Sequence, residues 1–353
     1  MAKLKKLLIF GVYGQKMTIC SKERNLKSLR SGMPGRMKIL NRLFCLLILP
    51  GIILLLTNCT KDDSEKPGKE ELIVDLTESI DSDSLEADVK WLQAMGTRFA
   101  LAENHKTVAD AIKKRFLLMG YRNAASDSFL IRKTYRNVAY EQWQYNVYAF
   151  IRGVEYPDSL CIVGGHYDNA VIAGDPFAVV PGANDNASGT AAVLEIARVM
   201  KKMNFRPKST IVFIAFGAEE LGLWGSHDFA ADPEGFSGKI RFMLNNDMIA
   251  CEPDEDSASW YVNIIDYENS HSLRAEAEII CSRFTSLAFR NDNTYNKQSD
   301  SYPFFTNGYK ALFFFSDVVD PNIHTLNDVA ANCNFEYCRE IVKLSCALLV
   351  DKN

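Results

Sequence analysis

Five residues of metal-ligand type stand at five separate places along the chain, each next to an apolar run. They are His166, Asp185, Glu220, Asp247 and His324. Imidazole nitrogen combined with carboxylate oxygen suits zinc as the bound metal. The pattern predicts that these side chains converge on a pair of zinc ions, although each residue taken alone has an ordinary structural explanation.

The first candidate ligand, His166, lies in the motif GGHYD at residues 164–168, directly after the apolar run 160–163. This order places His166 at the end of a buried strand. Asp168 lies two residues further on, and its carboxylate can accept the second N–H of the imidazole, as carboxylates behind zinc-bound histidines commonly do. A purely structural histidine is the alternative.

The second candidate ligand, Asp185, lies in the turn-rich stretch PGANDNASG at residues 181–189, before an apolar helical pattern over 191–203. A carboxylate at such a junction between loop and helix can reach two metals at once. The alternative is that these polar residues only form a turn and cap the helix.

An acidic pair, Glu219 and Glu220, lies in the segment AFGAEELGLWGS at residues 215–226, after the strand-like run 209–214. One glutamate can bind a metal while its neighbour acts as the general base on metal-bound water. An acidic first helical turn is the alternative, but the apolar and glycine flanks fit a solvated helix start poorly.

The last two candidate ligands also follow strand-like runs. Asp247 comes after the run 240–244, and His324 comes after the run 310–315. Helical patterns over 104–119 and 335–349 alternate with such strands, which predicts a three-layer α/β/α sandwich around a mixed, mostly parallel sheet. Open sheets of this kind place their sites at the carboxyl ends of the strands.

These motifs, together with NDM at 246–248 and HT at 324–325, resemble peptidase family M28, the co-catalytic zinc aminopeptidases. The resemblance covers roughly residues 85–350 and implies the zinc-exopeptidase fold, phosphorylase/hydrolase-like. It implies two zinc ions per chain, with Asp185 bridging them, His166 and Asp247 on one ion, and Glu220 and His324 on the other. Glu219 would be the general base that removes a proton from a zinc-bound water molecule to form hydroxide, and Asp168 would orient His166. A cis peptide between Asp185 and Asn186 is also implied.

One departure from the family concerns residues 299–301, where this chain has SDS and many members have SDH. The missing imidazole at Ser301 affects the expected hydrogen bonding to substrate and leaves the metal set intact. Two alternatives to an aminopeptidase remain. One is a glutaminyl cyclase on the same fold, against which the uninterrupted run 219–226 argues; the other is a binding ectodomain without metals, against which the complete ligand set argues.

The amino terminus predicts export. A 14-residue apolar run at 43–56 follows Lys38 and Arg42, as in the signal peptides of exported proteins. It ends in LTNC at 56–59, which resembles a bacterial lipobox with Cys59 as the lipidated residue. An ordinary secretory signal or an uncleaved anchor is the alternative. We expect a signal peptide with an overlong extension at 1–58, a flexible acidic tether at 59–83 and a single peptidase domain at 84–353.

The expected location is a bacterial cell envelope, as an outer-membrane lipoprotein facing the periplasm or the surface. From Cys59 onward the chain has 29 Lys and Arg against 43 Asp and Glu, a formal net charge of −14, which argues against nucleic acid as a partner. The expected partners are peptides with a free amino terminus, with membrane contact only through the lipid at Cys59. Six further cysteines are compatible with disulfides. The oligomeric state and the side-chain specificity stay open.

Overall fold

The computed structural model describes residues 68–353, apart from residues 234–235, 237, 253 and 255. The segment from Lys66 onward forms one compact unit. The predicted signal peptide at 1–58 and the predicted lipidated Cys59 lie outside the described residues. None of the described helices combines the length and apolar character needed to cross a bilayer.

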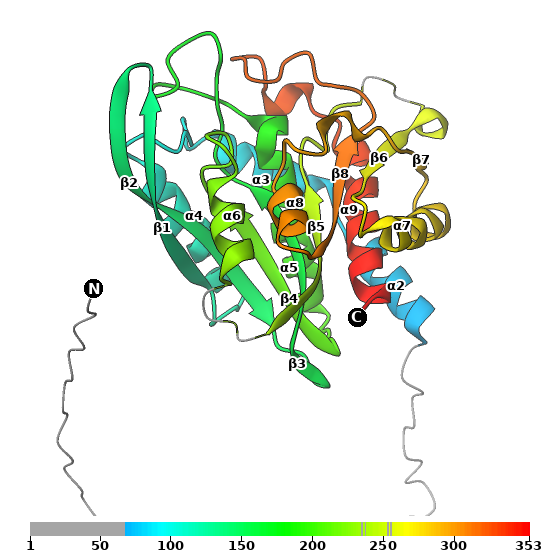
Figure 1. The fold of residues 1–353 in the computed structure, drawn as a ribbon. Coiled ribbons are helices and arrows are strands. Elements are labelled where there is room, and N and C mark those ends of the chain that lie inside the picture. Colours follow the sequence, from blue (N-terminus) through cyan, green and yellow to red (C-terminus); the bar gives the residue numbers. More distant parts are fainter. Residues whose placement is uncertain (1–67, 234–235, 237, 253, 255) are drawn as a thin grey trace, which may run out of the picture. The chain divides into compact units, whose positions relative to one another are not determined.

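A single mixed sheet forms the centre of this unit (Figure 1). Its strands lie side by side in the order β1-β2-β4-β3-β5-β8-β6-β7. Strand β3 runs parallel to β4 and β5, β5 runs parallel to β8, and β6 runs parallel to β7. The other three neighbouring pairs are antiparallel. The strands are β1 Ala125–Tyr135, β2 Val138–Ile151, β3 Tyr156–His166, β4 Ser209–Phe216, β5 Lys239–Asn246, β6 Tyr261–Ile265, β7 Ala288–Arg290 and β8 Lys310–Ser316.

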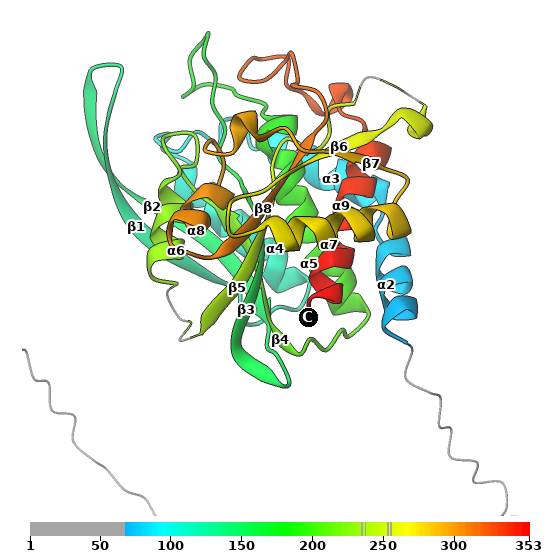
Figure 2. The same ribbon diagram turned by 45° about the vertical axis from the view of Figure 1, so that its right-hand side comes forward.

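Helices cover both faces of the sheet, as Figures 1 and 2 show from two directions. One face carries α2 Lys69–Glu78, α3 Ser82–Gln93, α4 His105–Leu118, α5 Gly189–Lys202, α7 His271–Phe284 and α9 Phe335–Asp351. The other face carries the short helices α6 Trp224–Ala231 and α8 Ser301–Thr306. The predicted three-layer architecture with a mixed sheet is therefore confirmed.

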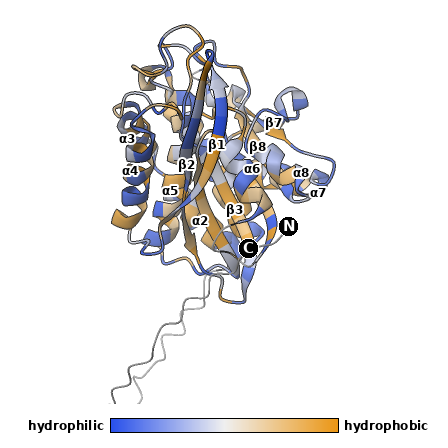
Figure 3. Cartoon of the chain, turned by 60° about the vertical axis from the view of Figure 1, so that its left-hand side comes forward, coloured by the Kyte–Doolittle hydropathy of each residue, from blue (hydrophilic) through white to orange (hydrophobic). Residues whose placement is uncertain are grey.

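Strand β4 shows why the sheet is buried on both faces, since all eight of its residues are buried. Ile211, Phe213 and Ala215 point into the cluster shared with α5 and α9. Val212, Ile214 and Phe216 point into the cluster shared with α6 and α8. Successive side chains of a strand alternate between faces, so a continuous apolar run fills both layers. Figure 3 shows the complementary pattern on α3 and α4, which carry hydrophilic as well as hydrophobic residues.

The predicted tether boundary at residue 83 was wrong. Helix α2 begins at Lys69 and packs against α9. Ile73 and Leu76 are almost fully buried on one side of this helix, and Ile80, just past its end, is buried as well. The charged residues between them obscure this apolar stripe, which is why the segment looks like an unpatterned tether in the sequence.

The six cysteines from Cys161 to Cys346 are all free thiols. Cys161, Cys281, Cys338 and Cys346 are buried, while Cys251 and Cys333 are partly exposed. The disulfides with which the cysteine count was compatible are thus absent from residues 68–353 as described. This part of the chain is held together by its apolar clusters.

Candidate metal centre

The predicted ligands meet at one edge of the sheet. His166 is the last residue of β3, and Asp247 directly follows β5. Glu219 and Glu220 lie in the loop after β4, and His324 lies in the loop after β8. These four strands are parallel neighbours, so their carboxyl ends lie side by side at one end of the strands. Binding sites of open sheets form at this end.

Asp185 reaches this edge from the irregular helical turn Ala183–Ser188, which leads into α5. The peptide bond from Asp185 to Asn186 is cis, as the family resemblance implied. The turn fits closely against the end of β5. A Cβ on Gly189 would lie 2.0 Å from the carbonyl oxygen of Asn246, so only glycine permits this approach.

Side chains of metal-ligand type form two groups, one of His166 and Asp247 together with the expected base Glu219, and one of Asp185, Glu220 and His324. Asp185 also connects the groups, because its Oδ1 lies 3.4 Å from Nε2 of His166 and its Oδ2 lies 3.1 Å from Nε2 of His324. The remaining neighbours are close as well: Oδ1 of Asp247 is 3.3 Å from His166 Nε2, and Oε2 of Glu220 is 3.0 Å from His324 Nε2.

These separations fit metal coordination. Ligand atoms at about 2.0–2.1 Å from a tetrahedral zinc ion lie roughly 3.3 Å from one another. Two carboxylate oxygens, Oε1 of Glu220 and Oδ1 of Asp247, are buried without a hydrogen-bond partner. Unpaired buried carboxylate oxygens are costly, and a bound cation would supply the missing partner. The donor set therefore fits a pair of zinc ions.

The electrostatics of the cluster point the same way. Burial raises the pKa of Glu220 to about 7, and the charge of Asp185 adds to this rise. Burial also raises the pKa of Glu219 well above its usual value. The pKa of His324 rises to about 10 through its contacts with Asp185 and Glu220. So many buried carboxylates need positive charge, which two divalent ions would provide.

Asp168 acts differently from the prediction. Nδ1 of His166 lies 3.1 Å from the backbone carbonyl oxygen of Asp168 and 3.6 Å from its carboxylate. The carboxylate instead accepts the backbone N–H groups of Glu219, at 3.0 Å, and Glu220, at 3.3 Å. Asp168 therefore orients His166 through its main chain and holds the acidic pair in place through its side chain.

Two residues that the sequence analysis missed hold the loop of Asp185. Asp328 accepts the backbone N–H groups of Asn184, at 2.7 Å, and Asp185, at 3.0 Å. Arg98 is fully buried and donates to the carbonyl oxygens of Pro181 and Gly182. It also donates to the carbonyl of residue 167, next to the first ligand. The two residues thus fix the relative positions of the segments carrying the ligands.

The two serines of residues 299–301 have different partners. Ser299 donates to Oδ2 of Asp247 at 2.5 Å, which leaves only Oδ1 of that carboxylate free. Ser301 is buried and its hydroxyl pairs with the hydroxyl of Tyr267 at 2.8 Å. The serine that replaces the family's histidine therefore belongs to the core beneath the site.

Between these two serines, Asp300 is buried, and neither of its carboxylate oxygens has a hydrogen bond of normal geometry. Burial raises its pKa from 3.8 to about 7, which His166 and Ser226 only partly oppose. Such a carboxyl group destabilises the fold when it ionises, because the unfolded chain ionises more easily.

We therefore expect a pH-dependent effect of Asp300→Asn in the chelator-treated protein. As pH rises from 4 to 7, the unfolded parent loses this proton first, so its free energy of unfolding falls. The variant has no carboxyl group at position 300, so its free energy of unfolding does not fall for this reason. Relative to the parent, the variant should gain about 2–4 kcal/mol between pH 4 and pH 8, measured by urea unfolding at both values. A constant difference across this range would contradict a raised pKa.

A cavity of about 120 Å³ opens beside the ligands. Its other walls are mainly apolar: Met248, Tyr295, Phe313, Phe315, Val319 and Ile323, with Gln298 as the polar exception. The cavity therefore presents an apolar recess next to the predicted metals.

The comparisons with known proteins agree with this geometry. The sequence model of Peptidase family M28 matches residues 146–349. A probable zinc metalloprotease of Leptosphaeria maculans is 27% identical over 334 residues, which cover 80% of this chain and 77% of that protein. Aminopeptidase YwaD of Bacillus subtilis is 36% identical over 188 residues, which cover 50% of this chain and 37% of that protein.

Solved structures share the fold. The LapA aminopeptidase of Legionella pneumophila aligns with a TM-score of 0.68 at 20% identity, over 81% of this chain and 74% of that one. A glutaminyl cyclase of Bacteroides thetaiotaomicron aligns with a TM-score of 0.60 at 16% identity, over 78% and 99%. With the family match extending over more than half of its length, and the ligand motifs in one cluster, this chain belongs to peptidase family M28.

Proposed function

We propose that this peptidase is a zinc-dependent aminopeptidase that removes single residues from the amino terminus of peptides with the help of two zinc ions. The observation that carries the proposal is the orientation of the Asp185 carboxylate, because one of its oxygens faces His166 and the other faces His324. A carboxylate placed in this way can bridge two ions. The names of the zinc metalloprotease and aminopeptidase relatives support the same choice.

The roles of the chain's own residues follow from the cluster. Paired zinc ions lower the pKa of a water molecule and polarise the scissile carbonyl group. Glu219 lies beside the residues that would hold these ions, with Oε2 at 3.8 Å from His166 Nε2. It would accept the proton of the attacking water and deliver it to the leaving amine. Asp168 keeps Glu219 in position through the backbone N–H bond described above.

The cavity favours an apolar first residue in the substrate. Phe313, Phe315 and Ile323 line it beside the ligands, and a recess of this size accommodates one side chain. The neighbouring carboxylates suit the positive charge of a free amino terminus. An apolar recess distinguishes residues by roughly 1–3 kcal/mol per methylene, and it offers a charged side chain no partner.

A panel of aminoacyl-p-nitroanilides tests the proposal, together with a peptide that begins with Gln. We expect two zinc ions per chain, loss of activity with a chelator, and at least tenfold faster release of Leu or Met than of Asp or Lys. Formation of pyroglutamate by a chain with one zinc ion would instead identify a glutaminyl cyclase. Absence of both metal and turnover would identify a binding domain.

We further propose that the protein is a lipoprotein of a bacterial cell envelope, anchored at Cys59. The support is the apolar run 43–56, which ends in the lipobox-like sequence LTNC. Radiolabelled palmitate that enters the parent chain but not a Cys59→Ser variant would be the expected result.

A further inference from the structure

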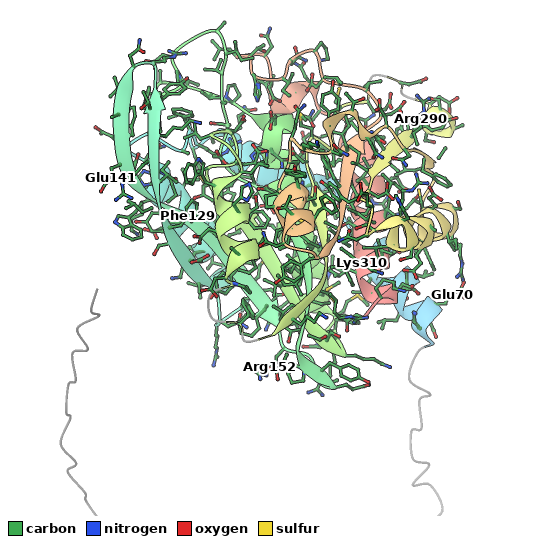
Figure 4. The ribbon with its side chains drawn as sticks, viewed as in Figure 1. Glu70, Phe129, Glu141, Arg152, Arg290 and Lys310 are labelled. Carbon is green, nitrogen blue, oxygen red and sulfur yellow. The ribbon has the colours of Figure 1, made fainter. Side chains whose placement is uncertain are left out.

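A second cavity lies at the opposite edge of the sheet from the metal centre. Its volume is about 760 Å³. It is bordered by Lys239 at the start of β5 and by Lys310 at the start of β8. Figure 4 labels Lys310 at the lower end of β8, away from the carboxyl end of this strand, which leads to the ligand loop. Nothing in the proposed peptidase reaction uses this cavity.

The charged lining of this cavity is mostly positive. It contains Lys239, Arg241, Lys310 and Lys352, against the single carboxylate of Glu276. Glu276 pairs with Lys352 at 2.8 Å. Among the described residues, the other three cations have no carboxylate within ion-pair distance. Arg241 donates to the hydroxyl of Ser209 and to Sγ of Cys161, and Lys310 donates to the hydroxyl of Ser272. Three of these positive charges therefore lack an ion-pair partner in the part of the chain that the structure describes.

This concentration of positive charge contrasts with the rest of the domain. Residues 68–353 contain 27 Lys and Arg against 40 Asp and Glu. A basic cavity on an otherwise acidic protein attracts anions locally while the remaining surface repels them. Its lining also includes the apolar residues Phe242 and Leu273, so the ligand that fits best combines an anionic group with apolar parts.

The chain enters the domain beside the same cavity. Lys69, at the start of α2, pairs with Asp351 at the end of α9 at 2.7 Å. The next residue, Lys352, lines the cavity. Cys59 precedes Gly68 by nine residues, which span at most about 30 Å when extended. A lipid attached to Cys59 would therefore hold this edge of the domain near the bilayer surface.

We propose that the basic cavity docks the domain on a membrane by binding the phosphate groups of anionic lipid headgroups. Its position relative to the bilayer rests on the anchor proposed at Cys59, whereas the binding itself does not. Docking through this edge would point the metal centre away from the lipid, toward dissolved peptides.

The test uses the compact unit from Lys66 to Asn353, which contains the whole described core and carries no lipid. Its partitioning onto vesicles with equal parts of phosphatidylglycerol and phosphatidylcholine is measured by co-sedimentation at an ionic strength of about 0.15 M. Each Lys or Arg near an anionic surface strengthens association about fivefold. A Lys239→Glu, Lys310→Glu double variant should therefore partition at least about 25-fold more weakly.

The matched control reverses two exposed lysines of α4, Lys106→Glu and Lys114→Glu, which changes the net charge equally. We expect it to retain most of its vesicle binding. Equal losses in both double variants, or no binding of the parent unit, would overturn the proposal. Release of the parent unit from the vesicles by millimolar inorganic phosphate at constant ionic strength would also overturn it, since the cavity would then be a site for free phosphate. Peptidase activity, measured in parallel, keeps this outcome separate from the proposed function.

Discussion

The Glu219→Gln variant is expected to hydrolyse an aminoacyl-p-nitroanilide about 10²–10⁴-fold more slowly than the parent while keeping both zinc ions. Glutamine has nearly the same shape as glutamate but cannot accept the proton of the attacking water. The backbone N–H of residue 219 would still bond to Asp168, so the loop should stay in place. Turnover, zinc content and circular dichroism are measured on the same preparation.

Two further variants make this result specific. Glu220→Gln removes a ligand next to His324, so it should lose zinc as well as activity. Glu268→Gln makes the same chemical change at an exposed position, and it should behave like the parent. Near-normal turnover of the Glu219 variant would show that another group acts as the base.

The Asp185→Ala variant should fall from two zinc ions per chain to fewer than one, with activity at background level. Asp185 contributes an oxygen to each group of ligands, so its loss weakens both positions at once. Zinc is measured by mass spectrometry after dialysis against a weak chelator.

Asp175→Ala is the matched control for this experiment. Asp175 is exposed and lies ten residues earlier in the chain, outside both ligand groups. It should retain two zinc ions and full activity. If the Asp185 variant also kept two ions, Asp185 would not be a bridging ligand, and the site would have to be rebuilt around Glu219, which the structure places near His166 and Asp247.

The positions of the candidate ligands could be predicted because parallel strands bring the residues that follow them in the sequence to the same end of the sheet. His166 and Asp247 each follow an apolar run in the sequence, and β3 and β5 are neighbours in the sheet. Their convergence then needs no further information. The family resemblance added the order of the motifs and the cis peptide at Asp185.

The supporting contacts were not predictable in the same way. Asp328 bonds to residues 143 and 144 positions earlier in the chain, and no local pattern marks such a contact. Arg98 looks like an ordinary surface residue in the sequence, yet it is fully buried because four backbone carbonyl oxygens satisfy its guanidinium. Asp168 was correctly placed beside His166, but its backbone carbonyl oxygen rather than its carboxylate lies nearest to the imidazole, and the carboxylate accepts the backbone N–H groups of the acidic pair.

The place of β8 in the sheet constrains the order in which this chain can fold. Strand β8 is the last in sequence, yet it lies between β5 and β6, as Figure 2 shows. Strands β6 and β7 reach the rest of the sheet only through it. Until residues 310–316 have left the ribosome, β5 has an open edge and the β6–β7 pair has no sheet to join. Long-range pairing of this kind slows folding, and an open edge invites pairing between chains. The sheet therefore closes only after β8 has been synthesised, and any chain that lacks this strand carries an open edge at which it can aggregate.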